Sequence, residues 1–171
     1  INDLHGKTLG VIGKGAIGMK VGRIAKAFGM NINYFSVRNY KKTQLLKFLS
    51  SLDYLSIHCP LNEKTKDLIT IKELKIMKKN MILINTARGG IVNENDLTKA
   101  LKQKIIAGAG IDVTTSEPPK KSHAYYSILN EANFIWTPHT AWASNETLQE
   151  AINQLIKNIN SFYKGRKRNI V

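Results

Sequence analysis

Short apolar runs alternate with helical patterns along the whole chain, and this alternation restricts the possible folds more than any other feature. Compact or alternating apolar runs predict strands at Thr8–Gly13, Asn31–Phe35, Asp53–His58, Met81–Asn85, Ile105–Ile111 and Phe134–Thr137. Apolar residues at helical spacing predict helices at Ile17–Phe28, Leu45–Leu49, Ile71–Met77, Asn93–Lys102 and from Ser144 onward. Strands that alternate with helices indicate an α/β fold, a doubly wound parallel sheet with right-handed crossovers.

The composition fits one globular domain in a reducing compartment. The chain has 171 residues, of which 43% are hydrophobic, and a single cysteine, Cys59. No apolar run approaches the roughly 18 residues that span a bilayer, and the N-terminal residues lack the layout of a signal peptide. We therefore expect a cytoplasmic protein without a membrane partner.

The net charge of +14 admits two interpretations. Lysine and arginine total 26 against 12 acidic residues, which could form a surface for nucleic acid. Alternatively, it reflects a general enrichment in lysine, asparagine and isoleucine. The basic residues are scattered, and only Lys164–Arg168 forms a cluster, so we favour the second interpretation and do not expect a nucleic-acid partner.

A glycine-rich motif lies between the first predicted strand and helix, at Gly13-Lys14-Gly15-Ala16-Ile17-Gly18. In such a motif the first glycine permits a tight turn, the second admits a pyrophosphate, and the third lets helix and strand pack closely. The helix N-terminus then offers free N–H groups to the phosphates. The motif predicts a Rossmann-like dinucleotide-binding domain in which Gly13, Gly15, Ala16, Ile17 and Gly18 contact the cofactor.

The carboxylate that usually binds the ribose of NAD is missing. No acidic residue occurs between Asp3 and Asp53, and Ser36 holds the expected position, followed by Arg38, Lys41 and Lys42. Cations near a small hydroxyl can attract a 2′-phosphate, which favours NADP, or use of both NAD and NADP. Alternatively, Ser36 and a backbone group bind the ribose while the cations remain solvated.

Further motifs follow the later strands in a recognisable order, and together they resemble the D-2-hydroxyacid dehydrogenase family over essentially the whole chain. The motifs are Gly13–Gly18, Ser56–Leu61 with Thr65, Asn85–Gly90, Gly110–Val113 with Glu117-Pro118, and Thr137–His139.

Three residues of these motifs suit the reduction of a 2-oxo acid. The planar fork of Arg88 can bind the carboxylate of such an acid, and the imidazole of His139 can act as general acid. Glu117 can orient that imidazole and favour its charged form. These are the roles that the resemblance implies; the alternatives are a structural histidine and a solvated glutamate.

The resemblance also implies further cofactor contacts. Asp112 would lie near the nicotinamide carboxamide, and the other residues expected to line the cofactor are Cys59, Pro60, Thr65, Thr86, Ala87, Ala141 and Trp142. His58 is expected to be structural or cofactor-adjacent, and Cys59 is not expected to be a nucleophile. The four histidines show no paired spacing and there is no cysteine cluster, so no metal site is predicted.

Within the family, His139–Ala143 and Ser116–Pro119 are most similar to glycerate dehydrogenases, also called hydroxypyruvate reductases. Phosphoglycerate dehydrogenases, D-lactate dehydrogenases and broad 2-oxo acid reductases remain open. The resemblance implies that residues 1–171 form the dinucleotide-binding domain and that helix 144–164 returns to a substrate domain that this chain lacks. It also implies a homodimer in the full-length form.

Two functions of different kinds follow. The first is an NAD(P)-dependent oxidoreductase acting on a 2-oxo acid or D-2-hydroxy acid, most similar to enzymes of hydroxypyruvate and D-glycerate. The second is a non-catalytic dinucleotide-binding module, like the family's corepressor branch. The complete Arg88, Glu117 and His139 set favours the first, although we do not expect these 171 residues to turn over alone.

Overall fold

The computed structural model describes residues 3–170, so the outermost positions of the predicted domain, 1–2 and 171, lie outside the described residues. The chain divides into two compact units, one ending at Pro138 and the other beginning at His139. The first unit holds the sheet and most of the helices, and the second holds the C-terminal helix.

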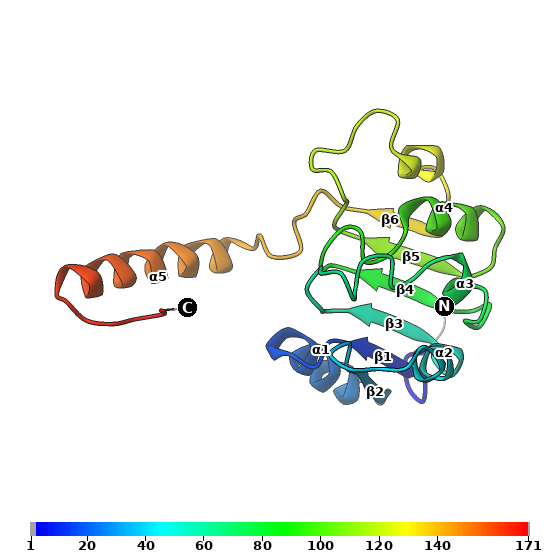
Figure 1. Ribbon diagram of the computed structural model, residues 1–171, viewed down its shortest axis with the longest axis horizontal. Coiled ribbons are helices and arrows are strands. Elements are labelled where there is room, and N and C mark those ends of the chain that lie inside the picture. The colour runs from blue at the N-terminus through cyan, green and yellow to red at the C-terminus, as the bar shows by residue number, and fades with distance from the viewer. Residues whose placement is uncertain (1–2, 171) are drawn as a thin grey trace. The chain divides into compact units, whose positions relative to one another are not determined.

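The first unit is built on a six-stranded, wholly parallel sheet in the order β2-β1-β3-β4-β5-β6 (Figure 1). The strands are β1 (Thr8–Ile12), β2 (Asn31–Phe35), β3 (Tyr54–Ile57), β4 (Ile82–Asn85), β5 (Gly108–Ile111) and β6 (Phe134–Trp136). The strand order reverses between β1 and β3, and this reversal confirms the predicted doubly wound α/β fold. Loops after β1 and β3 therefore diverge, which leaves room for a ligand at the carboxyl ends of these strands.

The helices follow the predicted periods with small shifts at their ends. They are α1 (Ala16–Ala27), α2 (Lys42–Ser50), α3 (Ile71–Leu74), α4 (Glu94–Lys102) and the 3-10 helix η1 (Ala124–Ile128). Helix α3 ends at Leu74 rather than at the predicted Met77, because the chain turns there and still buries Met77 in the core. Between β5 and β6, where the sequence analysis places no helix or strand, the chain forms η1, whose Tyr125 and Ile128 are buried.

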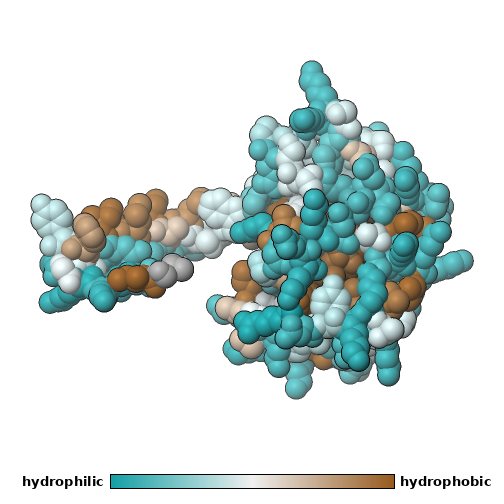
Figure 2. Space-filling view, viewed as in Figure 1, coloured by the Kyte–Doolittle hydropathy of each residue, from teal (hydrophilic) through white to brown (hydrophobic). Residues whose placement is uncertain are grey.

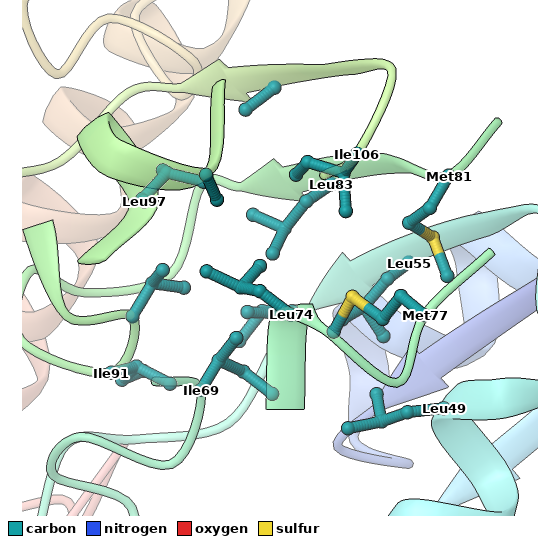
Figure 3. Close-up of a cluster of buried hydrophobic side chains, with 14 of the residues drawn as sticks. Leu49, Leu55, Ile69, Leu74, Met77, Met81, Leu83, Ile91, Leu97 and Ile106 are labelled. Carbon is teal, nitrogen blue, oxygen red and sulfur yellow. The ribbon is translucent and has the colours of Figure 1, made fainter. Parts of the chain in front are cut away.

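The hydrophobic core lies mainly on one face of the sheet. Alternate strand residues such as Leu55 and Leu83 point into it and meet side chains of α2, α3 and α4. Figure 3 shows Leu74, Leu83, Leu97 and neighbouring side chains converging in this cluster. A smaller cluster on the opposite side of β1 joins Leu9 and Val11 to Ala25 of α1. Helices therefore pack on both sides of β1, which positions the loops on either side of the strand-order reversal.

The second unit contains helix α5 (Asn145–Tyr163), which begins where Ser144 accepts a hydrogen bond from the amide of Thr147. No residue of this helix is buried, and its large apolar side chains are 39–90% exposed. Figure 2 shows apolar side chains gathered along α5. These residues are Leu148, Ile152, Leu155, Ile156, Ile159, Phe162 and Tyr163.

Within residues 3–170, none of the helices combines the length and the apolar character needed to cross a membrane.

Candidate active site

A cleft of about 990 Å³ opens at the carboxyl ends of β1, β2 and β3, at the strand-order reversal. Its position is the one at which doubly wound sheets bind ligands. The residues that line it are Gly13, Lys14, Gly15, Ser36, Val37, Arg38, His58, Cys59, Pro60, Asn62, Glu63 and Lys64.

The glycine motif forms the inner wall of this cleft, and its three glycines meet different constraints. Gly13 has φ +100°, and a Cβ there would lie 2.5 Å from the carbonyl oxygen of His58. A Cβ on Gly18 would lie 2.1 Å from the carbonyl oxygen of Gly13, so only glycine lets α1 pack this closely. A Cβ on Gly15 would meet nothing within 4 Å and would instead project from the N-cap of α1 beside the cleft. This open backbone at a helix N-terminus fits a pyrophosphate.

Ala16 and Ile17 of the motif lie outside the cleft wall, whereas Lys14 lines it. Neither Ala16 nor Ile17 is among the described side chains that line the cleft, and the Ile17 side chain is 67% exposed. Ala16 and Ile17 could therefore contact the expected cofactor only through their backbone, in the first turn of α1.

Positive charge gathers at the outer end of the cleft. Ser36 and Arg38 follow β2, and the Ser36 hydroxyl lies 3.5 Å from the amide of Arg38. Lys64 Nζ donates to the carbonyl of Arg38 at 3.3 Å, and Lys14 also lines the cleft. Glu63 is the acidic side chain among the lining residues. The Lys64 ammonium thus contacts the backbone of Arg38, although 26 residues separate the two.

Two lysines predicted near this end belong elsewhere. Lys42 Nζ pairs with Glu73 Oε1 at 2.8 Å, which ties α2 to α3. Lys41 is the N-cap of α2, and its amide donates to the side chain of Gln44 at 2.9 Å. Of the four residues noted after the second strand, Ser36 and Arg38 line the cleft whereas Lys41 and Lys42 do not.

The turn after β3 supplies the facing wall. Cys59 and Pro60 line the cleft, and burial raises the pKa of the Cys59 thiol to about 11, so it remains a thiol at neutral pH. Thr65 is fully buried and does not line the cleft; its hydroxyl donates to the carbonyl of Pro60 at 2.7 Å. This hydrogen bond from Thr65 to Pro60 stabilises the turn in which Asn62 and Lys64 line the cleft.

His58 also lines this wall. Its Nε2 lies 2.8 Å from the Ser56 hydroxyl, and burial lowers the pKa of the imidazole. The ring is therefore neutral at pH 7, in agreement with a structural or cofactor-adjacent position.

The loop after β4 is organised by a buried side chain. Asn85 Oδ1 accepts from the amide of Ala87 at 3.1 Å, and Asn85 Nδ2 donates to the carbonyl of Arg88 at 3.0 Å. Thr86 and Arg88 are exposed, and Arg88 Nη1 also donates to the carbonyl of Ala87 at 2.6 Å. The Arg88 backbone is thus fixed while its guanidinium remains accessible.

The loop after β5 carries two carboxylates. Asp112 is buried and accepts a short hydrogen bond from the Thr137 hydroxyl, which joins the ends of β5 and β6. Glu117 is exposed, and its Oε1 accepts from the amide of Thr114 at 3.0 Å. This bond holds the Glu117 carboxylate near the end of β5.

The second unit begins with His139, whose backbone is left-handed at φ +54°. Within this unit the indole N–H of Trp142 donates to the carbonyl of His139 at 3.0 Å. Because of this hydrogen bond, Trp142 holds the turn in which His139 lies. The side chains of Ala141 and Trp142 are exposed.

The sequence interpretation missed five lining residues and one supporting residue. Lys14, Val37, Asn62, Glu63 and Lys64 line the cleft, and Asn85 supports the Arg88 loop. Lys14 was recognisable from its place inside the glycine motif, whereas the others depend on how the turns fold.

Among the side chains of residues 3–170, no group of three or more His, Cys, Asp and Glu residues could hold a metal ion.

The doubly wound sheet and the glycine-lined cleft at its strand-order reversal define a dinucleotide-binding domain. The sequence profile of the D-isomer specific 2-hydroxyacid dehydrogenase NAD binding domain matches residues 1–141. The chain therefore belongs to this family, which confirms the resemblance drawn from its motifs.

Known relatives agree with this assignment. The chain is 43% identical to a glycerate dehydrogenase of Methylorubrum extorquens, over 100% of the chain and 54% of that protein. It is 33% identical to a hydroxypyruvate reductase of Blautia hydrogenotrophica, over 99% of the chain and 54% of that protein. An NAD complex of a D-isomer specific 2-hydroxyacid dehydrogenase from Lactobacillus delbrueckii ssp. bulgaricus has a TM-score of 0.89 at 30% identity, over 99% of this chain and 57% of that one. The chain spans about half the length of these relatives.

Proposed function

We propose that the full-length polypeptide containing these residues transfers a hydride between a nicotinamide cofactor and C2 of a small 2-oxo acid or D-2-hydroxy acid. The observation that carries the proposal is the convergence of a dinucleotide cleft with the Arg88 and Glu117 loops at the same edge of one parallel sheet. A cofactor lying across this edge would bring its nicotinamide toward those loops.

The cofactor-binding part of the proposal rests on the glycine cradle. Gly13 makes the tight turn, Gly15 leaves backbone open to the pyrophosphate, and Ser36 and Arg38 lie where the adenosine ribose is expected. Cys59 and Pro60 form the facing wall, while Thr86, Ala87 and Asp112 follow the strands nearer the proposed nicotinamide end. When bound, the reduced cofactor supplies the hydride that C2 receives.

The chain's own residues would perform the remaining tasks. Arg88 would bind the substrate carboxylate through its two-pronged guanidinium and thereby hold C2 in place. His139 would donate a proton to the oxygen on C2 as that oxygen becomes an alkoxide, and would accept the proton in the reverse direction. Glu117 would orient the imidazole and stabilise its protonated form.

For the substrate we propose hydroxypyruvate and D-glycerate. Two observations support this choice: the Trp142 motif after His139, and the relatives that are a glycerate dehydrogenase and a hydroxypyruvate reductase. Glyoxylate is the next substrate to test, since another relative, from Korarchaeum cryptofilum, is a glyoxylate reductase.

For the cofactor we propose acceptance of NADP as well as NAD. Arg38, the Lys64 ammonium that contacts the Arg38 backbone, and Lys14 beside the glycines give the cleft positive charge near Ser36. A 2′-phosphate placed there would gain charge-assisted hydrogen bonds, and no carboxylate follows β2 to repel it.

The proposal extends to the assembly and setting of the whole protein. Residues 1–171 would serve as the dinucleotide-binding domain, and helix α5 would lead into a substrate domain that closes over the reaction and excludes water. The exposed apolar face of α5 is consistent with a further contact surface, and we propose a homodimer. The single cysteine, Cys59, fits a cytoplasmic setting.

The test is reduction of hydroxypyruvate and glyoxylate by NADH and by NADPH, followed by His139→Ala in the full-length polypeptide. We expect kcat to fall at least about 100-fold in this variant because the proton donor is lost. The dissociation constant of NADH, measured by fluorescence, should change less than about 2-fold. Unchanged turnover would remove His139 from the mechanism. Cofactor binding without reduction of any 2-oxo acid would instead favour a non-catalytic binding module.

A further inference from the structure

One partly buried carboxylate outside the proposed catalytic set accepts three hydrogen bonds from a single loop. Glu94 is the first residue of α4, and its side chain is 13% exposed. Its Oε1 accepts from the amide of Thr115 at 2.7 Å, and its Oε2 accepts from the Thr115 hydroxyl at 2.8 Å. Its Oε2 also lies 2.8 Å from His123 Nε2. Glu94 therefore joins α4 to two points of the loop between β5 and η1.

His123 is suited to this contact in its neutral form. Its Nδ1 accepts from the amide of Tyr125 at 3.3 Å and so begins η1, which leaves Nε2 as the protonated nitrogen that donates to Glu94. The imidazole stacks on Trp136, with ring centroids 5.6 Å apart, and its side chain is 9% exposed. Both ring nitrogens thus have a partner, and the ring is held by β6 as well as by α4.

The loop that Glu94 holds is the one that carries Glu117. Thr115 follows Thr114, whose amide donates to Glu117 Oε1 at 3.0 Å and whose hydroxyl donates to the carbonyl of Ser116 at 2.9 Å. A displacement of Thr115 would carry Thr114 with it and would move the amide that holds the Glu117 carboxylate.

The same backbone also touches the Arg88 loop. A Cβ added to Gly89 would lie 2.0 Å from the carbonyl carbon of Thr114 and 2.4 Å from the amide of Thr115, so the two backbones are in close contact. A Cβ on Gly90 would lie 3.2 Å from the Thr115 methyl group. The loops that bear Arg88 and Glu117 therefore meet at Thr114 and Thr115, and Glu94 fixes that meeting point.

The negative charge of Glu94 contributes to this role. Charge-assisted hydrogen bonds are stronger than neutral ones, and a carboxylate has enough lone pairs to accept all three donors. Burial, with the nearby charge of Glu94, raises the pKa of Tyr125 in η1. A glutamine in place of Glu94 has one oxygen and one NH2 group. The NH2 group would face at least one of the groups that now donate to Glu94, and that hydrogen bond would be lost.

We propose that Glu94 is a positioning residue for the reaction, which holds Thr115 and His123 so that the Arg88 and Glu117 loops keep their relative placement. This inference rests on the proposed function, since Arg88 and Glu117 act on the substrate only if that function holds. Glu94 lies outside the described lining of the cofactor cleft. Its effect should therefore fall on the 2-oxo acid and spare the dinucleotide.

The test compares Glu94→Gln with Asp96→Asn in the full-length polypeptide. Asp96 lies in the same first turn of α4, but its carboxylate accepts from the amide of Ile71 and does not contact the Glu117 loop. For Glu94→Gln we expect kcat/KM for hydroxypyruvate to fall up to about 100-fold, because displacements near 1 Å have effects of this size. For Asp96→Asn we expect kcat/KM to stay within about 3-fold of the wild type.

Thr115 provides a second, graded comparison. Thr115→Val removes the hydroxyl but keeps the amide and the shape, so kcat/KM should fall less than in Glu94→Gln. Thr115→Ser keeps both donors and should restore most of kcat/KM. Hydrogen exchange of the peptide containing residues 112–123 supplies a readout that does not require turnover. Exchange should be faster in Glu94→Gln and unchanged in Asp96→Asn.

The outcomes separate the inference from the function on which it rests. A wild-type protein that reduces no 2-oxo acid would overturn both the proposed function and the positioning role. An active wild type whose Glu94→Gln variant matches Asp96→Asn in kcat/KM would overturn the positioning role alone, even if loop exchange is faster. A selective loss in Glu94→Gln, with an unchanged dissociation constant of NADH, would support it.

Discussion

The buried side chain of Asn85 holds the backbone of Arg88, because Asn85 Nδ2 donates to the Arg88 carbonyl at 3.0 Å. The side chain closes the loop after β4 through a second bond, from the amide of Ala87. The proposed carboxylate-binding arginine thus takes its backbone position from the last residue of a central strand.

Replacement of Asn85 by aspartate tests this support. The carboxylate cannot donate, so Asn85→Asp would place negative charge against the Arg88 carbonyl. We expect KM for the 2-oxo acid to rise about 10-fold, which corresponds to loss of a buried hydrogen bond. Asn31→Asp is the matched control, because Asn31 Nδ2 donates to the carbonyl of Gly6 at 3.1 Å in an exposed place away from the cleft. Equal KM values in the two variants would contradict the support role.

Gly15 and Gly18 should respond differently to alanine. Gly15→Ala adds a methyl group that meets no protein atom within 4 Å, so the melting temperature should stay close to that of the wild type. The methyl group would occupy the proposed pyrophosphate position, and the dissociation constant of NADH should rise about 10-fold or more. Gly18→Ala places Cβ against the Gly13 carbonyl and should lower the melting temperature as well. Unimpaired NADH binding in Gly15→Ala would argue against a cofactor at this loop.

The cations of the cleft should affect NADPH more than NADH. Arg38→Ala and Lys64→Ala each remove a positive charge near Ser36, and each should raise the dissociation constant of NADPH about 10-fold. The constant for NADH should rise less than about 3-fold. Lys20→Ala on α1 is a control because Lys20 does not line the cleft. Strong preference of the wild type for NADH would contradict the proposed use of NADP.

Acid should weaken the fold partly through Glu73. Burial alone would raise the pKa of Glu73, but hydrogen bonds from Lys42 and Thr70 hold it below its ordinary value. Since the unfolded chain binds a proton more readily, this stabilisation is present at neutral pH and is lost as pH falls from the ordinary glutamate range through the lowered pKa. We therefore expect Glu73→Gln to lower the free energy of unfolding at pH 7 by about 1–2 kcal/mol.

Urea unfolding at pH 7 and at pH 3 measures this effect of Glu73. The difference between wild type and Glu73→Gln should shrink at the lower pH, because a larger fraction of the Glu73 carboxylate is then protonated and, like glutamine, uncharged. Glu131→Gln, at an exposed position, should change the free energy of unfolding by less than about 0.5 kcal/mol. A difference that stays constant with pH would exclude ionisation of Glu73 as its source.

Local patterns predicted most of the fold. Apolar periods placed all six strands within three residues of their observed starts, and the helix predicted from Asn93 matches α4, of which Asn93 is the N-cap. The 3-10 helix η1 was not predicted, because its five residues carry no helical period and depend on burial of Tyr125 and on the cap from His123. The early end of α3 was missed for a similar reason, since Met77 is buried without being helical.

The sequence by itself determined the order of the motifs and the glycine cradle, and it predicted the set of Arg88, Glu117 and His139, because each depends on residues close together in the chain. Only the tertiary structure decided which charges share a site. Lys64 joins Arg38 at the cleft while Lys42 is paired with Glu73. Glu94 reaches Thr115 and His123 across 21 and 29 residues. Such pairs form because packed strands bring separate loops to one edge of the sheet, and no local period encodes that meeting.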